Sequence, residues 1–282
     1  MALFRIEARI ITRSARSNML AAAAYRSGTR LHDQMNATCH DYTAKAGRVV
    51  ATEIIGPAHM PEAFKDRARL WNTVEQSEKR RDAQLAREFL LSLPHELSDG
   101  ERIALVRGFV QEQCVAKGMI ADIAWHRPDT ARGEHPHNHH AHVLTTLRRC
   151  TPDALAPVKT RAWNAQSQLQ AWRAAYAAHC NQALARAGHQ TRVDHRPLTA
   201  QKADALQNGD LRSAFRLNRF PEPYIPRAAL RAGRTMAAPP QTAQRYQAKL
   251  DIIARNATRT REAGENLREL FMRLDARRAA AD

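Results

Sequence analysis

The sequence predicts an α+β fold: a central antiparallel sheet with helices packed on it, followed by a basic helical C-terminal extension. Short segments with strand character alternate irregularly with amphipathic helices. The strands follow one another in hairpin-like order, which favours an antiparallel sheet with helices on one side. Aromatic residues become scarce after about residue 199, whereas arginine stays frequent, and this change indicates the extension.

The first 120 residues carry alternating strand and helix patterns. Apolar and polar side chains alternate at residues 3–11, which predicts a strand, and further strands are predicted at residues 49–55 and 86–93. Helical periodicity predicts helices at residues 19–26, 63–83 and 98–117. Gly28 ends the first helix, and Ser98 caps the third. Residues 40–43 are expected to form a polar turn.

The remaining chain is expected to complete the domain and to continue into a linker and a tail. A strand is predicted at residues 119–126, and the stretch 134–146 ends with strand character, with a hairpin loop expected over 129–138. A long helix is expected over 163–187, and an extended segment over 191–197. The predicted organisation is one domain over residues 1–200, a proline-containing linker over 201–240 and a basic helical tail over 241–282.

Composition points to a polyanionic partner. Forty-four Lys and Arg residues against 28 Asp and Glu give a net charge of +16 and a pI near 10.6. Such a charge favours nucleic acid first and an anionic membrane surface second. No apolar run reaches the roughly 20 residues that span a bilayer, so no membrane insertion is expected. The four scattered cysteines and the lack of a secretory signal favour a cytoplasmic protein with reduced thiols.

A histidine-rich stretch at residues 134–146 predicts a metal site. Side chains two apart in a strand point to the same face, so His140 and His142 project together. His126 ends the preceding strand, and an antiparallel hairpin would bring it close to the pair. Three histidines without a nearby cysteine indicate an open catalytic site rather than a closed structural zinc site.

Two further residues accompany this site. Tyr25 lies in the last turn of the alanine-rich helix, and a tyrosine can form a covalent intermediate when a nearby metal polarises a phosphoryl oxygen. Glu88 is a carboxylate inside a strand, where it either forms a surface ion pair or supports the site.

Six segments in register resemble the MobA/MobL group of plasmid mobilisation relaxases, which are HUH-type single-strand endonucleases. The resemblance covers roughly residues 1–200, and residues 200–282 carry no motif of this group. The segments are SNMLAAAAYRSG, HDYTAKAGRVVATEI, AREFLLSLPHELS, AWHRP, NHHAHVLTT and RVDHRPL.

The resemblance implies a role for each matching residue. Tyr25 would be the nucleophile that attacks the scissile phosphodiester, giving a 5′-phosphotyrosine link and a free 3′-hydroxyl. His126, His140 and His142 would hold a divalent metal, Mg²⁺ or Mn²⁺, and Glu88 would be the acidic residue near it. The fold would be the palm of the HUH relaxases.

Other residues around the motifs are expected to support the site or to contact DNA. Asn138 and His139 precede the metal-binding pair, and His139 stands where the family usually has proline, so it could add a fourth imidazole. Arg26, Arg127 and Arg196 flank the motifs and are expected to contact phosphates.

The expected partners follow from the same resemblance. They are single-stranded DNA at an origin of transfer, accessory mobilisation proteins and a type IV secretion and coupling apparatus. The protein would act in the cytoplasm and could travel with the transferred DNA. No GxxxxGK[ST] motif occurs, so a separate helicase is expected to unwind the DNA.

Two alternatives stay open from the sequence. An HUH replication initiator or transposase often carries its tyrosine after the histidines, where Tyr176 and Tyr224 stand in this chain. Tyr176 lies in a packing stripe and Tyr224 in a proline-rich segment, which disfavours that alternative. A metal-stabilised DNA-binding protein without cleavage activity is the second alternative, and Tyr25→Phe separates it from a nuclease.

Overall fold

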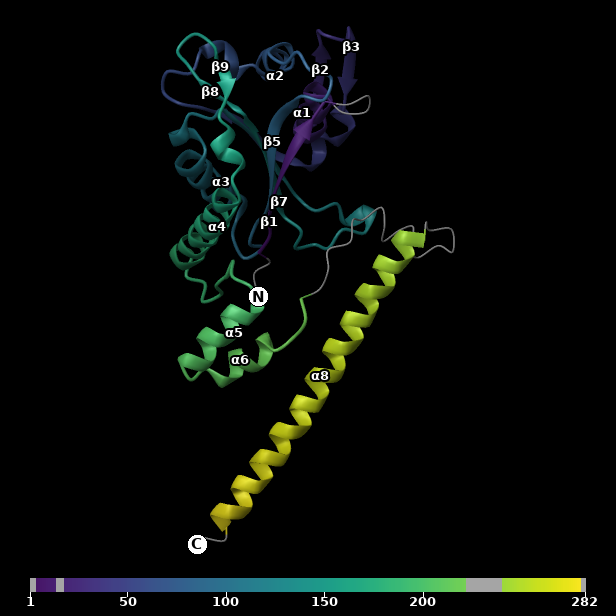
Figure 1. Cartoon of the computed structure of the whole chain (residues 1–282), viewed down its shortest axis with the longest axis vertical. Helices are drawn as coiled ribbons and strands as arrows, with labels where there is room; N and C mark the ends of the chain where they lie inside the picture. Colours follow the sequence, from purple (N-terminus) through teal and green to yellow (C-terminus); the bar gives the residue numbers. More distant parts are fainter. Residues whose placement is uncertain (1–3, 14–17, 222–239, 280–282) are drawn as a thin grey trace. The chain divides into compact units, whose positions relative to one another are not determined.

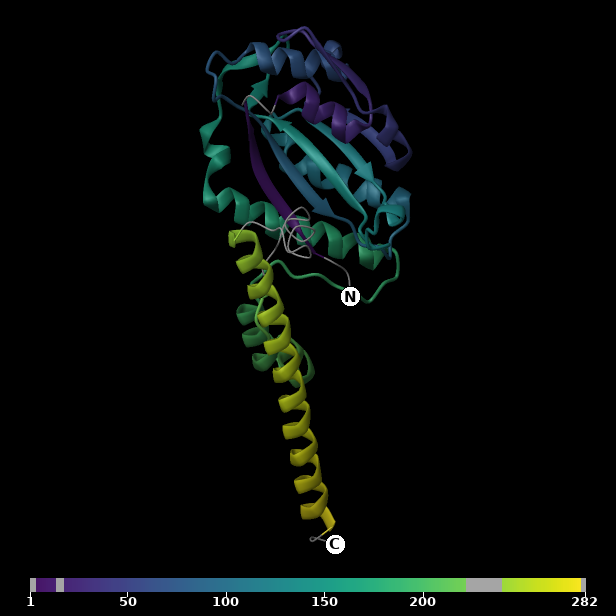
Figure 2. The same cartoon turned by 90° about the vertical axis from the view of Figure 1, so that its right-hand side faces the viewer.

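The computed structural model describes residues 4–13, 18–221 and 240–279 and forms two compact units, Met1–His195 and Arg196–Asp282 (Figures 1 and 2). The first unit is built on a sheet with the order β1-β5-β7-β6-β4, in which every neighbouring pair is antiparallel. The strands of this sheet are β1 (Ile6–Thr12), β4 (Val49–Ile55), β5 (Gln84–Ser92), β6 (Ala121–His126) and β7 (His140–Thr146). Two hairpins stand beside it, β2 (Arg30–Asp33) with β3 (Thr38–Asp41) and β8 (Arg148–Cys150) with β9 (Leu155–Lys159). The predicted central antiparallel sheet is confirmed.

Among the described residues, four α-helices belong to the first unit and three to the second. Those of the first unit are α1 (Met19–Ser27), α2 (Arg67–Gln76), α3 (Asp99–Gln113) and α4 (Gln166–Arg186). Those of the second are α5 (Leu198–Gln207), α6 (Leu211–Leu217) and α8 (Pro240–Ala279). Short 3-10 segments occur at Thr43–Arg48, Glu62–Lys65, Val115–Lys117, Thr130–Arg132 and Arg161–Asn164.

Helices cover both faces of the sheet, so the expectation that they lie on one side is wrong (Figure 1). On one face, Val143 of β7 belongs to a core that includes Trp172 of α4. On the other, Leu144 of β7 packs in a second core with Leu20 of α1 and Trp71 of α2. Adjacent strand residues point to opposite faces, so a strand that is apolar at both positions requires a covering layer on each side.

The second core gives way to polar residues along the strands, and this change positions the candidate site. Leu144 is buried beneath α1 and α2, whereas His142 and His140 follow on the same face of β7. The same face of β5 carries Glu88, and that of β6 carries His126. Buried polar side chains need hydrogen-bond partners, so this end of the face depends on a specific network.

Helix α2 ends earlier than predicted. The expected helix over 63–83 is a 3-10 turn followed by α2, which stops at Gln76. The guanidinium of Arg13 donates to the backbone carbonyls of Glu75 and Glu78 at 2.6 and 3.0 Å. These bonds satisfy carbonyl groups that a longer helix would use, so the chain can leave the helix here without unpaired groups.

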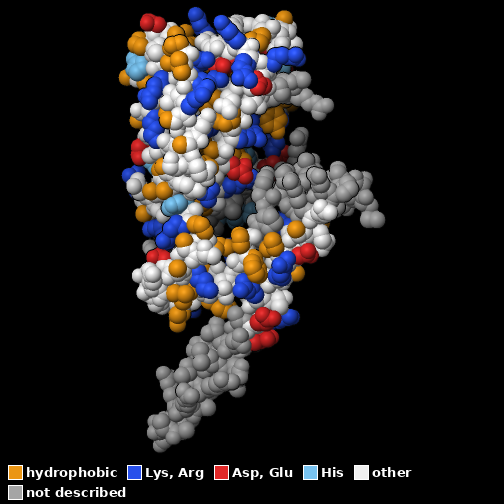
Figure 3. Space-filling model, viewed as in Figure 1, with side chains coloured by type: hydrophobic (Ala, Val, Ile, Leu, Met, Phe, Trp, Pro, Cys, Tyr) orange, Lys and Arg blue, Asp and Glu red, His pale blue; other side chains and the backbone are white. Residues whose placement is uncertain are grey.

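The second unit contains the predicted extension. Helix α8 falls on the predicted basic tail, α5 and α6 occupy the first part of the predicted linker, and residues 222–239 lie outside the described residues. Lys and Arg side chains are scattered over the visible surface rather than gathered into one patch (Figure 3). Among the described helices, none combines the length and apolar character needed to cross a bilayer.

Candidate active site

Three imidazole rings converge on one face of the sheet. Strands β6 and β7 pair with His126 opposite His140 and with Ala124 opposite His142, so the three rings project to the same side. One nitrogen from each ring lies within 4.8 Å of the others, and the ring centroids are 5.1 to 5.3 Å apart. The hairpin predicted from the sequence thus brings together the three predicted metal ligands.

Each ring is oriented by a hydrogen bond through its other nitrogen. His126 donates from Nε2 to the backbone carbonyl of Arg26 at 2.6 Å, and His140 donates from Nδ1 to that of Asn138 at 2.9 Å. His142 Nδ1 lies 2.7 Å from Oε1 of Glu88. Because carbonyl and carboxylate oxygens only accept hydrogen bonds, these nitrogens carry the protons. The opposite nitrogens are left as electron-pair donors, as in metal-binding histidines.

The electrostatics keep two of the rings neutral. Burial, with a further contribution from His142, lowers the pKa of His126 to about 3. Burial also lowers the pKa of His140 to about 4, although its bond to the Asn138 carbonyl opposes the change. A neutral imidazole is the form that binds a metal, so both rings are ready to bind one at neutral pH.

Glu88 is the centre of the surrounding network. Its side chain is 1% exposed and accepts hydrogen bonds from Nε of Arg26 and Nε of Arg9, both at 2.5 Å, and from His142. Burial alone would raise the pKa of Glu88, but the bonds from His142 and Arg26 outweigh it and hold the pKa well below its usual range. The predicted supporting role of Glu88 therefore has a geometric basis, because the carboxylate fixes His142.

Helix α1 is attached to this network through its last turn. Arg26 contacts His126 through its carbonyl and Glu88 through its guanidinium. The backbone and the side chain of this residue therefore both hold the end of α1 against the histidine cluster. Arg26 is only 9% exposed, and its charge is directed at Glu88 rather than offered to solvent as a phosphate contact. Gly28 closes the helix at φ 65°, and a Cβ there would lie 3.0 Å from the backbone of Ala46.

Tyr25 remains accessible at the end of α1. Its side chain is 44% exposed. The ring of Tyr42 meets it edge-on, with centroids 5.3 Å apart, and Nζ of Lys45 lies 3.1 Å from its ring centroid. Together these contacts hold the phenol from two sides while its surface stays open. Tyr42 lies in the predicted polar turn and Lys45 follows it, and nothing in their local sequence indicates the contact with Tyr25.

The other predicted residues lie in varied surroundings. His139 accepts a backbone bond from Leu93 through its carbonyl, and burial lowers the pKa of its ring. Arg127 is exposed and lies 3.5 Å from Asp99. Arg196 belongs to the second unit and pairs with Asp204 there at 3.1 Å.

Tyr176 does not offer an alternative nucleophile. Tyr176 is completely buried, and its hydroxyl donates to the carbonyl of Ser92 at 2.6 Å. Burial raises the pKa of Tyr176 well above its usual value, which opposes formation of a phenolate. Tyr224 lies outside the described residues. The packing role expected for Tyr176 is confirmed.

Comparison with known proteins identifies related sequences. Residues 16–210 match the profile of the MobA/MobL family. Mobilization protein MobL of Acidithiobacillus ferridurans is 34% identical over 223 residues, which are 70% of this chain and 58% of that protein. Conjugal transfer protein TraA of Rhizobium radiobacter is 37% identical over 169 residues, 56% of this chain and 15% of that protein. This chain therefore spans little more than half of the first relative and a small part of the second.

A solved structure has a similar fold. It comes from work on the molecular basis of vancomycin resistance transfer in Staphylococcus aureus. Its TM-score is 0.61 at 28% identity, and the match covers 69% of this chain and 99% of that chain.

Proposed function

This chain belongs to the MobA/MobL family, and we propose that it is a DNA relaxase that nicks one strand at a plasmid origin of transfer and later rejoins it. The observation that carries the proposal is the attachment of α1 to the histidine cluster. The Arg26 carbonyl accepts a hydrogen bond from His126, and the Arg26 guanidinium donates to the carboxylate that orients His142. An exposed phenol, Tyr25, stands next to this anchor.

The proposed reaction is a transesterification at phosphorus. The Tyr25 hydroxyl oxygen attacks the scissile phosphodiester as the phenol loses its proton. A bond forms between this oxygen and phosphorus, the bond from phosphorus to the 3′ oxygen breaks, and the 3′ oxygen takes up a proton. The products are a 5′-phosphotyrosine and a free 3′-hydroxyl. Because one phosphodiester replaces another, the reverse attack by the 3′-hydroxyl can rejoin the strand.

The donor set fits a divalent metal. His126, His140 and His142 would hold it, with their tautomers fixed by the bonds described above. A bound cation would supply charge that stabilises the phosphoryl oxygens in the transition state. Three imidazoles suit Mn²⁺ better than Mg²⁺, which prefers oxygen ligands, so we expect tighter binding of Mn²⁺. Glu88 and Arg26 would keep the rings and α1 in register during the reaction.

The substrate and partners follow from the same proposal. A net charge of +16 suits a nucleic acid substrate, and attack by a tyrosine requires an unpaired strand at the nick. Accessory mobilisation proteins, a coupling and secretion apparatus and a separate helicase would act with the protein, which we place in the cytoplasm before transfer.

A nicking assay tests the proposal. Supercoiled plasmid carrying the cognate origin is incubated with the full chain and Mn²⁺ and analysed on a denaturing gel. The wild-type protein should produce nicked plasmid, Tyr25→Phe none, and Tyr246→Phe, which removes the same atom from α8, the wild-type amount. Nicking by Tyr25→Phe at the wild-type rate would remove Tyr25 from the mechanism. DNA binding without nicking by any protein would favour a non-catalytic DNA-binding protein.

A further inference from the structure

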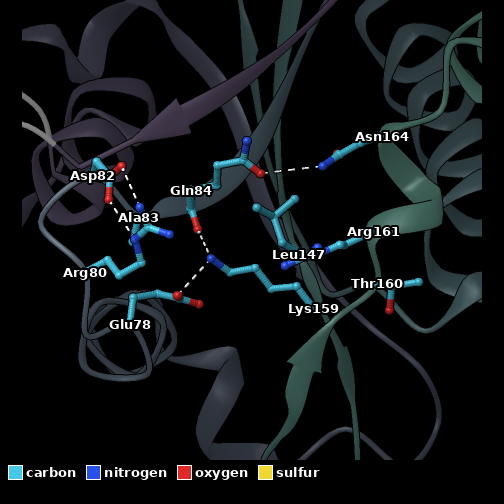
Figure 4. Close-up of a pocket in the computed structure, with 10 residues that line it drawn as sticks. All are labelled: Glu78, Arg80, Asp82, Ala83, Gln84, Leu147, Lys159, Thr160, Arg161 and Asn164. Atoms are coloured by element: carbon cyan, nitrogen blue, oxygen red, sulfur yellow. Dashed lines mark hydrogen bonds and ion pairs between the residues drawn. The ribbon is translucent and has the colours of Figure 1, made fainter.

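Two cavities meet beside the β1 edge of the sheet, away from the histidine cluster. The larger, of about 570 Å³, lies between residues 78–84 and 159–164 (Figure 4). The smaller, of about 240 Å³, lies between β1 and the start of α4. Gln84 and Asn164 line both, so we treat the two cavities as one feature and name it the flank groove.

The larger cavity carries spare positive charge. Its acidic residues are already paired: Glu78 with Lys159 at 2.8 Å, and Asp82 with Arg80 at 3.1 Å (Figure 4). Arg161 also lines the cavity and makes no hydrogen bond or ion pair with the residues that the structure describes. A guanidinium without an internal partner is available to a phosphate oxygen.

The smaller cavity contains a buried arginine without an acidic partner. Arg87 is 3% exposed, and within the described part of the chain no carboxylate forms an ion pair with it. Its Nη2 donates to Oδ1 of Asn164, its Nη1 has no partner, and its guanidinium lies 4.8 Å from the ring of Trp172. A buried unpaired charge costs several kcal/mol, and this cost is reduced when a ligand supplies an acceptor.

The walls of the smaller cavity suit a nucleobase. Trp163 and Trp172 line it together with Leu169 and the aliphatic side of β1. The two tryptophans are 5% and 1% exposed, so they form an apolar wall rather than a free stacking face. Selection comes from the guanidinium, which recognises the paired acceptors O6 and N7 of guanine. Aromatic walls, a buried donor and nearby phosphate-binding groups are the elements of a single-stranded DNA site.

Arg9 connects the flank groove with the candidate active site. Its Nε lies 2.5 Å from Oε2 of Glu88, and the residue also lines the smaller cavity. Glu88 and Arg87 are neighbours on β5 and point to opposite faces of the sheet. Because β1 is the edge strand, a DNA strand could pass from one face to the other over Arg9.

We propose that the flank groove binds a single-stranded DNA segment that adjoins the nick site, with a phosphate at Arg161 and one unpaired guanine in the cavity beside Arg87. The inference rests on the proposed function only in taking DNA as the substrate. It adds a second DNA site and a base preference at a place that the nicking chemistry does not use.

The test replaces a neutral amide by a carboxylate. Asn164→Asp supplies the missing partner of Arg87, so the thermal midpoint should rise while the guanine loses its donor. Gln182→Glu makes the same change on an exposed part of α4 and is the matched control. Binding of the full chain to an oligothymidine of about 16 nucleotides with one central guanine is measured by fluorescence anisotropy.

Asn164→Asp should weaken this binding roughly tenfold and abolish the preference for guanine over thymine, whereas Gln182→Glu should change it less than about twofold. Arg161→Gln should weaken binding to the oligothymidine with or without the central guanine. The slope of log affinity against log salt concentration should become shallower by the amount that one phosphate contact contributes. Equal affinity of Asn164→Asp and Gln182→Glu for the oligonucleotide would overturn the proposal. So would an Asn164→Asp variant that loses as much affinity for duplex DNA as for single-stranded DNA.

Nicking of the origin plasmid by the same variants separates the two proposals. If the wild-type protein does not nick but Asn164→Asp still weakens binding, the relaxase proposal fails and the flank groove stands. If the wild-type protein nicks and Asn164→Asp binds normally, the flank groove alone is wrong.

Discussion

Replacing Glu88 by glutamine tests how far one buried carboxylate holds the candidate site together. The substitution keeps the size of the side chain and removes its charge. Arg26 and Arg9 then face a neutral amide, and His142 loses its anionic acceptor. Removing one partner of a buried ion pair leaves the other charge uncompensated, which typically costs about 3–5 kcal/mol. The side chain of Arg9 is 66% exposed and can return to solvent, so we expect Glu88→Gln to lower the free energy of unfolding by about 3 kcal/mol.

The same change should weaken metal binding. A carboxylate behind a metal-binding histidine fixes its tautomer, and losing such a partner lowers metal affinity by roughly 10- to 100-fold. Urea unfolding measures the stability of the metal-free protein, and isothermal titration with Mn²⁺ measures the affinity.

Glu53→Gln is the matched control for this prediction. Glu53 lies on β4 with a 31% exposed side chain and forms an ion pair with Arg107 at 3.0 Å. A surface pair of this kind contributes less than about 1 kcal/mol. If Glu88→Gln loses no more stability than Glu53→Gln and binds Mn²⁺ with unchanged affinity, the network around Glu88 does not support the site as argued.

Three other outcomes are expected. Lys45→Met should lower the nicking rate about 5- to 10-fold with little change in KM, because the cation at the ring of Tyr25 positions the phenol, and Lys45→Arg should restore part of the rate. Gly28→Ala should destabilise the protein by about 1–3 kcal/mol in urea unfolding, because the left-handed φ of 65° is strained for alanine; an unchanged midpoint would contradict this. His126 and His140 have pKa values of about 3 and 4 in the folded protein and near 6.5 in the unfolded chain. Between these pKa values the unfolded chain binds more protons than the folded protein. The free energy of unfolding should therefore fall by about 1.4 kcal/mol per pH unit for each ring as the pH drops from 6.5 towards 4. The measurement is urea unfolding of the metal-free protein at several pH values, and a flat profile would show that these rings are not buried as neutral groups.

The histidine cluster could be predicted from the sequence because its geometry is local. Strand periodicity places His140 and His142 on one face, and the hairpin between β6 and β7 places His126 opposite His140. The same alternation places Glu88 correctly within β5. These inferences need only a period of two and an antiparallel pair.

The contacts that complete the site depend on tertiary packing and could not be predicted. Periodicity shows that α1 is a helix but not which face of the sheet it covers, so the second helical layer was missed. Lys45 and Tyr42 reach Tyr25 because the chain returns past the end of α1 after a short hairpin. The sequence predicts only a turn at residues 40–43 within this hairpin, because four-residue strands give too few alternations to recognise.

Arg26 illustrates a different limit. Because Arg26 flanks a motif in a basic protein, the sequence predicts that it contacts phosphate. In the structure its side chain is buried against Glu88. Sequence position alone does not distinguish an arginine that faces DNA from one that neutralises an acidic residue, because the partner lies 62 residues away.

The most direct test of the account is to identify the residue that becomes joined to DNA. The full chain is incubated with Mn²⁺ and a single-stranded oligonucleotide spanning the origin, digested with protease and nuclease, and analysed by mass spectrometry. The account predicts a nucleotide phosphate on the hydroxyl of Tyr25, and its loss when His126 is replaced by alanine. An adduct on another tyrosine, or on Tyr25 without any dependence on the three histidines, would contradict it.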